Sequence, residues 1–514
     1  MSTSLNFWLI APIVIPSLAA PFLILALRHD LKSQRIFSAL FAVLLLAVAI
    51  GLYGLAQDGI VRPYLLGAWP APFGIVLVLD RLSATMLLLT ATLGFAVVLY
   101  SMAGWDRRGR HFHPLFQFQL MGVNGAFLTG DLFNLFVFFE VMLISSYGLM
   151  LHGGGEKRLK GGFHYIAINL VGSTLFLFAV GVIYAVTGTL NMADLAQKAS
   201  QIAPGDVALL RTGALLLLIV FALKAALAPL HWWLPTAYAA APGPSAALFM
   251  IMTKIGAYAI LRTYTLIFGA DAGPVANIAA QWILPAGLAT LVVGALGALA
   301  SKTLLMMACF AIVWSMGSLF VALGLFNEAG IGAALYYLLH STLTGAALFL
   351  LADMLARRRA GSGDQLAPGP RLEQASLFAG LFFVGAIAMT GMPPLSGFIG
   401  KLFILEAGRG SSASVWIWGT VLSSSLVVTL AFARAGSVLF WKIDADAPLV
   451  EPKTTAPLIL PVAVCAALLA ATVLLSAMAG PVKRELDAIA RQTLDPQIYV
   501  RAVLAPSAPL ASGR

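Results

Sequence analysis

Five ionisable side chains stand inside long apolar stretches of the chain, at Glu140, Lys224, Lys254, His340 and Lys401. A charge at the centre of a bilayer costs about 2.5–3.5 kcal/mol on insertion scales, so such residues usually mark a functional path and have a compensating partner. Their spacing fits no metal-ligand set. A carboxylate, three amines and an imidazole can all accept and release protons, and the set therefore predicts a proton relay across a membrane.

Glu140 and Lys224 are the first expected pair. Glu140 lies in the middle of DLFNLFVFFEVMLISSYGL, and Lys224 lies in FALKAALAPLHWWLP shortly before Pro229. A nearby opposite charge favours the ionised form of each group, and a buried lysine that loses its partner releases its proton more easily. We therefore expect Lys224 to be the counter-ion of Glu140 in the relay; the alternative is a static ion pair that joins two helices.

The remaining three residues extend the relay along the chain. Lys254 lies well inside SAALFMIMTKIGAYAILRTY, where it is either a second cation of the relay or a lysine that snorkels to an interface. His340 lies among hydroxyl side chains in YYLLHSTLTG, a setting that suits either a water chain from Lys254 towards Lys401 or a histidine of helix packing. We place Lys401 in a polar interior rather than at the outer end of its helix.

Two further residues are accessory candidates. His231 follows Pro229 and either donates a hydrogen bond to carbonyls that the proline frees or takes part in the relay. Asp131 separates two apolar runs, and it either belongs to an ion entrance or caps the N-terminus of a helix.

The apolar stretches that carry these residues predict an all-α polytopic membrane protein. The chain is 60% hydrophobic and only 10% charged, whereas soluble domains carry about 25% charged residues. A spanning helix needs about 20 predominantly apolar residues. About fourteen helices are expected, at 4–27, 36–56, 82–103, 113–130, 132–151, 163–187, 209–240, 245–268, 277–300, 303–326, 331–353, 373–406, 415–440 and 456–479.

The seventh and twelfth of these helices are predicted to be broken. Prolines interrupt 209–240 at Pro229 and Pro235 and interrupt 373–406 at Pro393–Pro394. A broken helix is tolerated in a membrane only where protein buries it or where it lines a wet cavity. Interrupted helices at corresponding positions of two halves indicate an internal repeat with a site at the breaks; the alternative is two independent kinks.

An internal repeat divides the chain into four parts. Helices four to eight (113–268) and nine to thirteen (277–440) are the expected repeats, and five helices per unit make the second copy inverted. Helices one to three with an external hairpin occupy 1–112, and 441–514 holds helix fourteen and a tail with an amphipathic piece at 482–495 and a frayed end. Basic clusters in alternate loops, such as those at 107–110 and 157–160, predict both termini on the external side.

Composition and motifs exclude several classes of protein. The chain has no GxxxxGK[ST] phosphate loop and no strand-associated dinucleotide fingerprint, so neither ATP drive nor a redox cofactor is expected. Cys309 and Cys465 lie in apolar runs with no metal-ligand spacing, so we expect inert thiols and no metal. We attribute the net charge of +10 to cytoplasmic loops rather than to nucleic-acid binding.

Three long motifs resemble the D-type subunits of the Mrp-type (also Mnh or Pha) multisubunit cation/proton antiporters, a family related to the antiporter-like subunits of respiratory complex I. They are GDLFNLFVFFEVMLISSYGL, FALKAALAPLHWWLPTAYAAAPGPSAALFMIMTKIGAYAILR and MTGMPPLSGFIGKLFIL, and the resemblance extends over about 60–440. It implies fourteen helices with two inverted five-helix repeats, and membrane lysines and an acid at Glu140, Lys224, Lys254 and Lys401. Related subunits often carry a lysine where this chain has Gly345. Without that lysine, His340 and its hydroxyl neighbours are the expected proton carriers at this point of the relay.

The resemblance also implies a function and partners. We expect a proton-translocating subunit of a bacterial inner-membrane antiporter that exchanges Na⁺ or K⁺ for H⁺ and assembles with subunits of the A, B, C, E, F and G types. It would be a transporter component and not an enzyme. The alternative is a proton-pumping subunit of a quinone oxidoreductase or a membrane-bound hydrogenase, and a third hypothesis is a structural scaffold with inert buried charges.

Overall fold

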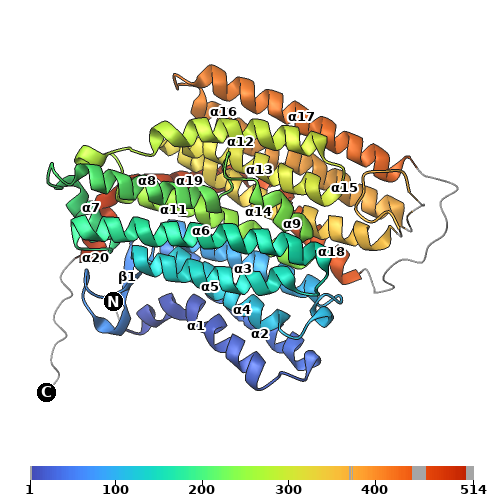
Figure 1. The fold of residues 1–514 in the computed structure, drawn as a ribbon, viewed down its shortest axis with the longest axis horizontal. Helices are drawn as coiled ribbons and strands as arrows, with labels where there is room; N and C mark the ends of the chain where they lie inside the picture. The colour runs from blue at the N-terminus through green and yellow to red at the C-terminus, as the bar shows by residue number, and fades with distance from the viewer. Residues whose placement is uncertain (1–2, 360, 370–371, 373, 443–458, 505–514) are drawn as a thin grey trace.

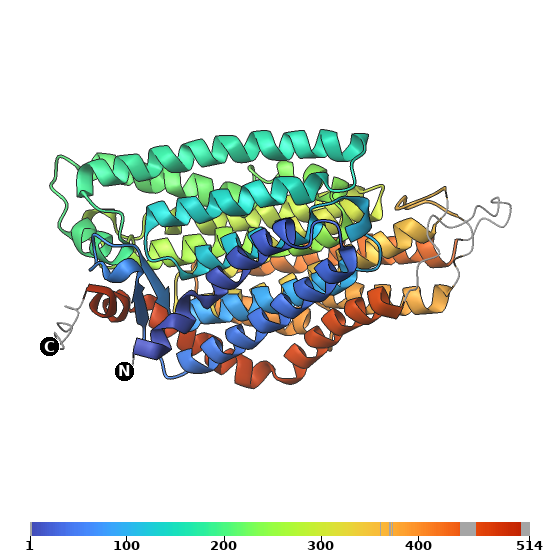
Figure 2. The ribbon, with the colours of Figure 1, turned by 90° about the horizontal axis from the view of Figure 1, so that it is seen from below.

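The computed structural model describes residues 3–359, 361–369, 372, 374–442 and 459–504. Within them the chain is mostly helical, and most helices lie side by side along one direction (Figure 1; Figure 2). A small hairpin lies at one end of this bundle. The predicted all-helical membrane architecture is confirmed.

The first part of the chain contains three long helices and the predicted hairpin. Its strands pair antiparallel, with Arg62 opposite Leu79 and Leu65 opposite Val76. Asp80 ends the second strand and caps the next helix by accepting a hydrogen bond from the backbone N–H of Ser83 at 2.8 Å. The elements are α1 (Thr3–Leu25), α2 (Leu31–Ala56), β1 (Arg62–Leu65), η1 (Leu66–Ala68), β2 (Val76–Leu79), α3 (Arg81–Ser101) and η2 (Asp106–Arg108).

The second part contains the first predicted broken helix. A helix ends at Lys224 and the next begins at Trp233, so the interruption covers the residues around Pro229. Asp131 caps the helix that carries Glu140 and accepts a hydrogen bond from the N–H of Asn134 at 2.8 Å. The elements are α4 (Phe112–Leu128), α5 (Leu132–Leu151), α6 (Glu156–Thr187), α7 (Met192–Ser200), α8 (Val207–Lys224), α9 (Trp233–Ala240), α10 (Gly243–Leu248) and α11 (Met250–Leu266).

The third part contains the second interruption, which falls at 391–395 and includes Pro393–Pro394. Gly391 ends the first half-helix with a φ of 72°, a left-handed conformation that glycine adopts without strain. The elements are η3 (Gly273–Val275), α12 (Ala280–Ala300), α13 (Leu304–Leu323), α14 (Glu328–Arg358), α15 (Ala375–Thr390), α16 (Ser396–Gly408) and α17 (Ser414–Phe440).

The C-terminal part runs along the bundle towards the end that holds the hairpin, and its last described helix lies at that end (Figure 1). Its elements are α18 (Ile459–Ala477), α19 (Ala479–Leu494) and α20 (Pro496–Leu504). The predicted amphipathic piece at 482–495 corresponds to α19, whose buried residues include Leu486 and Ile489. The prediction of a frayed end after 495 is wrong for 496–504, which forms α20 with Tyr499, Val500 and Val503 buried. The rest of that predicted end, 505–514, lies outside the described residues.

Twelve helices in the described part of the chain are long and apolar enough to cross a membrane. The two other predicted spans correspond to α4, which has 17 residues, and to the interrupted pair α15 and α16. Three features were not predicted, and the first is α20, which forms where a frayed end was expected. A short helix, α7, follows α6, and the predicted helix at 245–268 is divided at Phe249 into α10 and α11.

Candidate functional site

Glu140 and Lys224 each make a polar contact with α6. Ser173 donates a hydrogen bond from its hydroxyl to Glu140 Oε1, and Lys224 Nζ donates to Asn169 Oδ1 at 2.8 Å. The described residues contain no ion pair between Glu140 and Lys224 within 4.0 Å, so the expected direct contact is absent. Their charges still interact. Asn169 and Ser173 are one helical turn apart, so one face of α6 holds both the acid and the amine.

Lys224 lies at the point where its helix ends. Its side chain is 5% exposed, and Nζ lies 6.0 Å from the ring centre of Phe139, the neighbour of Glu140. The backbone carbonyl of Leu223, beside the interruption, accepts hydrogen bonds from the N–H of Ala226 at 3.1 Å and from Nε1 of Trp233 at 3.0 Å. The first residue of α9 therefore caps the carbonyl end of α8 across the gap.

His231 does not fill that capping role. It is half-buried in the interruption, and its buried Nδ1 atom has no hydrogen-bond partner among the described residues. The backbone carbonyl of His231 accepts a hydrogen bond from the N–H of Leu234 at 3.0 Å. The described residues show no side-chain hydrogen bond from His231 to a backbone carbonyl, whereas Trp233 donates one to the carbonyl of Leu223.

Lys254 is fully buried in α11, whose residues are all buried. Nζ lies 3.5 Å from the hydroxyl of Thr253, and the described residues offer it no acidic partner within ion-pair distance. This burial excludes the snorkelling alternative, since a snorkelling amine must reach an interface. Burying a charged amine is costly unless the amine donates hydrogen bonds to water or to another polar group.

His340 is fully buried in α14, and the charges of Lys401 and Lys254 both act on its imidazole. Its Nδ1 is 2.8 Å from the hydroxyl of Ser396 and 3.4 Å from that of Thr344. Nε2 makes no hydrogen bond of ordinary geometry within the described chain, although the carbonyl of Ala388 is near enough to interact electrostatically. The fully buried imidazole thus has hydroxyl partners at Nδ1, while Nε2 faces the carbonyl of Ala388 without a hydrogen bond of ordinary geometry.

Lys401 sits against the second interruption. Its ammonium donates hydrogen bonds to the carbonyl of Thr390, the last residue of α15, and to the hydroxyl of Ser425 at 2.8 Å. It also lies 4.1 Å from the ring centre of Trp314, a cation–π distance. The side chain is 5% exposed, so the structure places Lys401 in the interior.

Gly345 of α14 lies close to the side chain of Met250. A Cβ atom on Gly345 would lie 2.4 Å from Cε of Met250, so a longer side chain requires Met250 to move. With glycine at this position, His340 is the nearest ionisable side chain along α14.

A buried ion pair near the hairpin was not found from the sequence. Asp80 Oδ2 lies 2.6 Å from Nη1 of Arg262, and both side chains are buried. Burial alone would raise the pKa of Asp80, but the charge and hydrogen bonds of Arg262, with those of Ser83, hold it below its ordinary value. Arg262 itself could have been noticed, since it is a charged residue two turns after Lys254 on the same apolar helix. Its partner Asp80 could not, because it lies far away in the sequence.

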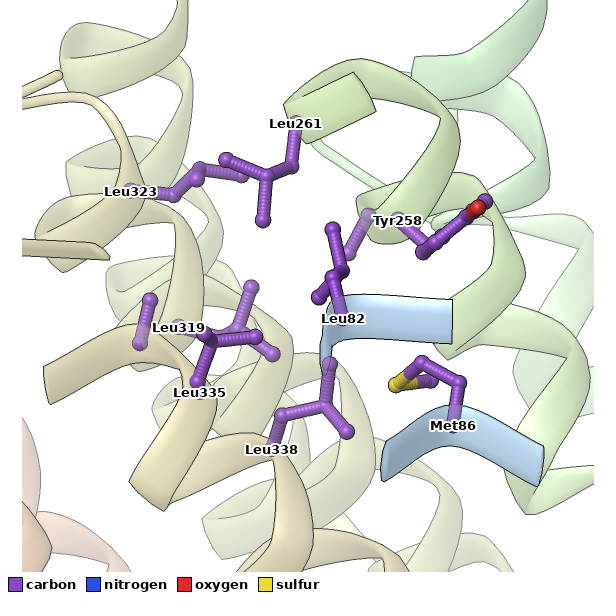
Figure 3. A pocket seen from close by; sticks show the side chains of 10 residues that line it. Leu82, Met86, Tyr258, Leu261, Leu319, Leu323, Leu335 and Leu338 are labelled. Carbon is purple, nitrogen blue, oxygen red and sulfur yellow. The ribbon is translucent and has the colours of Figure 1, made fainter. Parts of the chain in front are cut away.

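The interior between the two halves of the bundle is apolar where α3, α11, α13 and α14 meet. Figure 3 shows a small cavity there, lined by Leu82, Met86, Tyr258, Leu319 and Leu335 among others. The hydroxyl of Tyr258 is engaged by donation to the carbonyl of Phe127 at 2.7 Å. A cavity with an apolar lining offers ordered water no hydrogen-bond partners.

The fold and these residues define a class: a multi-pass helical membrane protein whose interior carries amines, an imidazole and a carboxylate beside two interrupted helices. The chain belongs to the family described as "NADH:quinone oxidoreductase/Mrp antiporter, TM", whose model matches residues 129–429, more than half of its length.

Full-length relatives agree with this membership. The chain is 41% identical to a probable K⁺/H⁺ antiporter D subunit of Rhizobium meliloti, over 100% of both chains. It is 38% identical to a Na⁺/H⁺ antiporter D subunit of Alkalihalophilus pseudofirmus, over 97% of this chain and 100% of the relative. Its fold matches a chain in the structure of the Mrp complex from Dietzia sp. DQ12-45-1b with a TM-score of 0.86 and 28% identity, over 98% and 100% of the two chains.

Proposed function

We propose that this chain is a proton-translocating subunit, of the D type, in a multisubunit cation/proton antiporter. The observation that carries the proposal is the row of buried groups that begins at Glu140 and Lys224, continues through Lys254 and His340, and ends at Lys401. Four of these five side chains are at most 5% exposed. Burying four protonatable groups without matching counter-charges is costly, and proton transfer is a function that uses them.

The relay works in three parts. Glu140 and Lys224 form a gate at one half-channel, where Asn169 and Ser173 hold the two charges apart but coupled. Lys254 and His340 carry the proton across the middle of the bundle with water and hydroxyl groups between them. Lys401 faces the other half-channel, and apolar packing such as the cavity beside Tyr258 keeps water from bypassing the relay.

The same proposal includes the organisation of the chain. The units are 1–112, the first repeat 113–268, the second repeat 277–440, and 441–514, and the two repeats are related by inversion with an interrupted helix in each. Both termini lie on the external side of a bacterial inner membrane. Support comes from the alternating basic loops and from the similar interruptions after Lys224 and before Lys401.

The partners follow from the relatives. Both relatives are named as subunits, so we propose that this chain assembles with subunits of the A, B, C, E, F and G types and that the complex exchanges Na⁺ or K⁺ for H⁺. A second candidate function is proton pumping in a quinone oxidoreductase or hydrogenase complex, because the description of the family also names NADH:quinone oxidoreductase.

The test is cation-dependent dissipation of a ΔpH in everted vesicles that carry the whole complex, with Na⁺, K⁺ and Li⁺ compared. Lys224→Ala and Glu140→Ala are expected to abolish exchange while the complex still assembles. Exchange at the wild-type rate in either variant would refute the relay. Loss of assembly in both would favour a structural role, and proton pumping driven by a quinone or by hydrogen with no cation response would favour the second candidate.

A further inference from the structure

Three arginines from distant segments of the chain converge on one tryptophan, outside the buried relay. The Cζ atom of Arg108 lies 4.0 Å from the ring centre of Trp105. The corresponding distances are 5.2 Å for Arg158 and 5.5 Å for Arg357. They come from η2, the first turn of α6 and the last turn of α14. These segments meet at the end of the bundle opposite the hairpin (Figure 1).

The positive charge of this arginine cluster, defined as Arg108, Arg158 and Arg357, exceeds the negative charge beside it. Asp353 lies 3.5 Å from Nε of Arg357, but its carboxylate also accepts hydrogen bonds from Tyr100 and from Trp105, at 2.7 and 2.8 Å. Within the described chain neither of the other two arginines has a carboxylate within ion-pair distance. Three guanidinium groups therefore share one carboxylate.

Neighbouring groups do not balance this charge. Asp106 is paired with Arg35 through two hydrogen bonds of 2.6 and 2.7 Å, and burial lowers the pKa of His152. Burial, and then the charge of Arg357, also lower the pKa of Arg108, as expected for cations that face one another. An anion bound among the arginines would remove this repulsion.

The start of α6 adds a second feature that suits an anion. Gly153, Gly154 and Gly155 all have positive φ, at 82°, 62° and 107°, and no side chain caps the helix that follows. Arg158 donates to the carbonyl of Gly154 at 2.6 Å. Free N–H groups at a helix start bind phosphate. Glu156, an acidic residue of this turn, is exposed.

An apolar surface leads away from the arginine cluster along α6. Leu159, Phe163 and Leu170 are 61%, 71% and 62% exposed, and their spacing of four and seven residues places them on one face of the helix. In a membrane this face contacts acyl chains. A molecule with a phosphate at one end and an acyl chain at the other fits both features.

We propose that the arginine cluster is a binding site for a phosphate group, of the kind that an anionic phospholipid presents at the membrane surface. The guanidinium fork of arginine matches phosphate oxygens bidentately. Trp105 holds the planar groups by stacking, and the apolar face of α6 receives the chain. Basic pockets between membrane helices are known settings for anionic lipid headgroups.

The experiment titrates the purified whole complex with phosphatidylglycerol, with phosphatidylcholine and with inorganic phosphate, and counts bound molecules by native mass spectrometry. The test variant is Arg108→Gln combined with Arg158→Gln. The matched control is Arg110→Gln combined with Lys160→Gln, which removes the same charge close to η2 and from the start of α6, at exposed positions. We expect phosphatidylglycerol affinity to fall at least tenfold in the test variant and less than twofold in the control.

The phosphate arm identifies the source of the ligand. Displacement of phosphatidylglycerol by inorganic phosphate supports a site for the phosphate group itself, and tight binding of inorganic phosphate alone assigns the site to free phosphate. If the glutamine variant fails to assemble, Arg108→Lys with Arg158→Lys keeps the charge but loses the fork and is expected to bind several-fold more weakly. An equal loss in the control variant overturns the proposal, as does loss of a neighbouring subunit with lipid binding unchanged.

Discussion

Asn169 is the residue whose role in the relay the structure predicts most directly. Lys224 is 5% exposed, and the amide oxygen of Asn169, 2.8 Å away, accepts a hydrogen bond from its amine. In Asn169→Leu the size is kept but the acceptor is lost. A buried donor left unsatisfied costs about 1–3 kcal/mol, and more when it is charged. Because about 1.4 kcal/mol corresponds to a tenfold change, we expect cation-driven proton exchange to fall by about ten- to a hundredfold.

The assay is the rate of ΔpH dissipation in everted vesicles, normalised to the amount of assembled complex. Thr174→Ala is the matched control, since Thr174 is an exposed residue of α6 that bonds only to its own helix, and exposed substitutions of this kind change stability by about 0.5 kcal/mol or less. Asn169→Asp restores an acceptor and is expected to exchange faster than Asn169→Leu. Wild-type exchange by assembled Asn169→Leu would show that the amide does not couple Lys224 to the relay.

Three other substitutions test the surroundings of the relay. Gly397→Ala should block assembly or exchange, because its Cβ would lie 2.0 Å from a backbone carbonyl across the second interruption, whereas Gly380→Ala meets nothing within 4 Å and should be silent. Trp314→Leu removes the aromatic ring that lies 4.1 Å from the ammonium of Lys401. Losing a buried cation–π interaction of about 2 kcal/mol should slow exchange by more than tenfold. Asp80→Asn leaves Arg262 buried without its ion partner, so we expect a loss of about 3–5 kcal/mol in the free energy of unfolding, measured as a lower melting temperature.

The Asp80 ion pair also makes the free energy of unfolding depend on pH in the acid range. The pKa of Asp80 is lower in the folded chain than its ordinary value, which is about 3.9 in unfolded peptides. Its contribution is therefore present above about pH 4 and is lost as the pH falls through the lower, folded value. In Asp80→Asn the melting temperature should vary less over this acid range than in the wild type. Equal acid sensitivity in the two proteins would contradict the assignment.

The sequence by itself determined most of the long helices and the ionisable groups of the proposed relay, but not α7, α20 or the ion pair of Asp80 with Arg262. Apolar runs of spanning length predict helices because every backbone group must be satisfied in lipid, and the observed bounds follow them closely. The hairpin and the interruptions follow from Pro and Gly, whose backbone restrictions are local. Glu140 and the lysines were found because a charge in an apolar run is conspicuous wherever the helix is placed.

Only the tertiary structure decided what each charge touches. Asn169 lies 55 residues from Lys224, and an asparagine in a helix has no feature in the sequence that marks it as the lysine's partner. The same holds for Trp105, which gathers arginines from three segments, and for the partner of Arg262. Contacts between helices depend on which faces pack together, and in a membrane protein this is set by close packing of many weak contacts rather than by any single residue pattern.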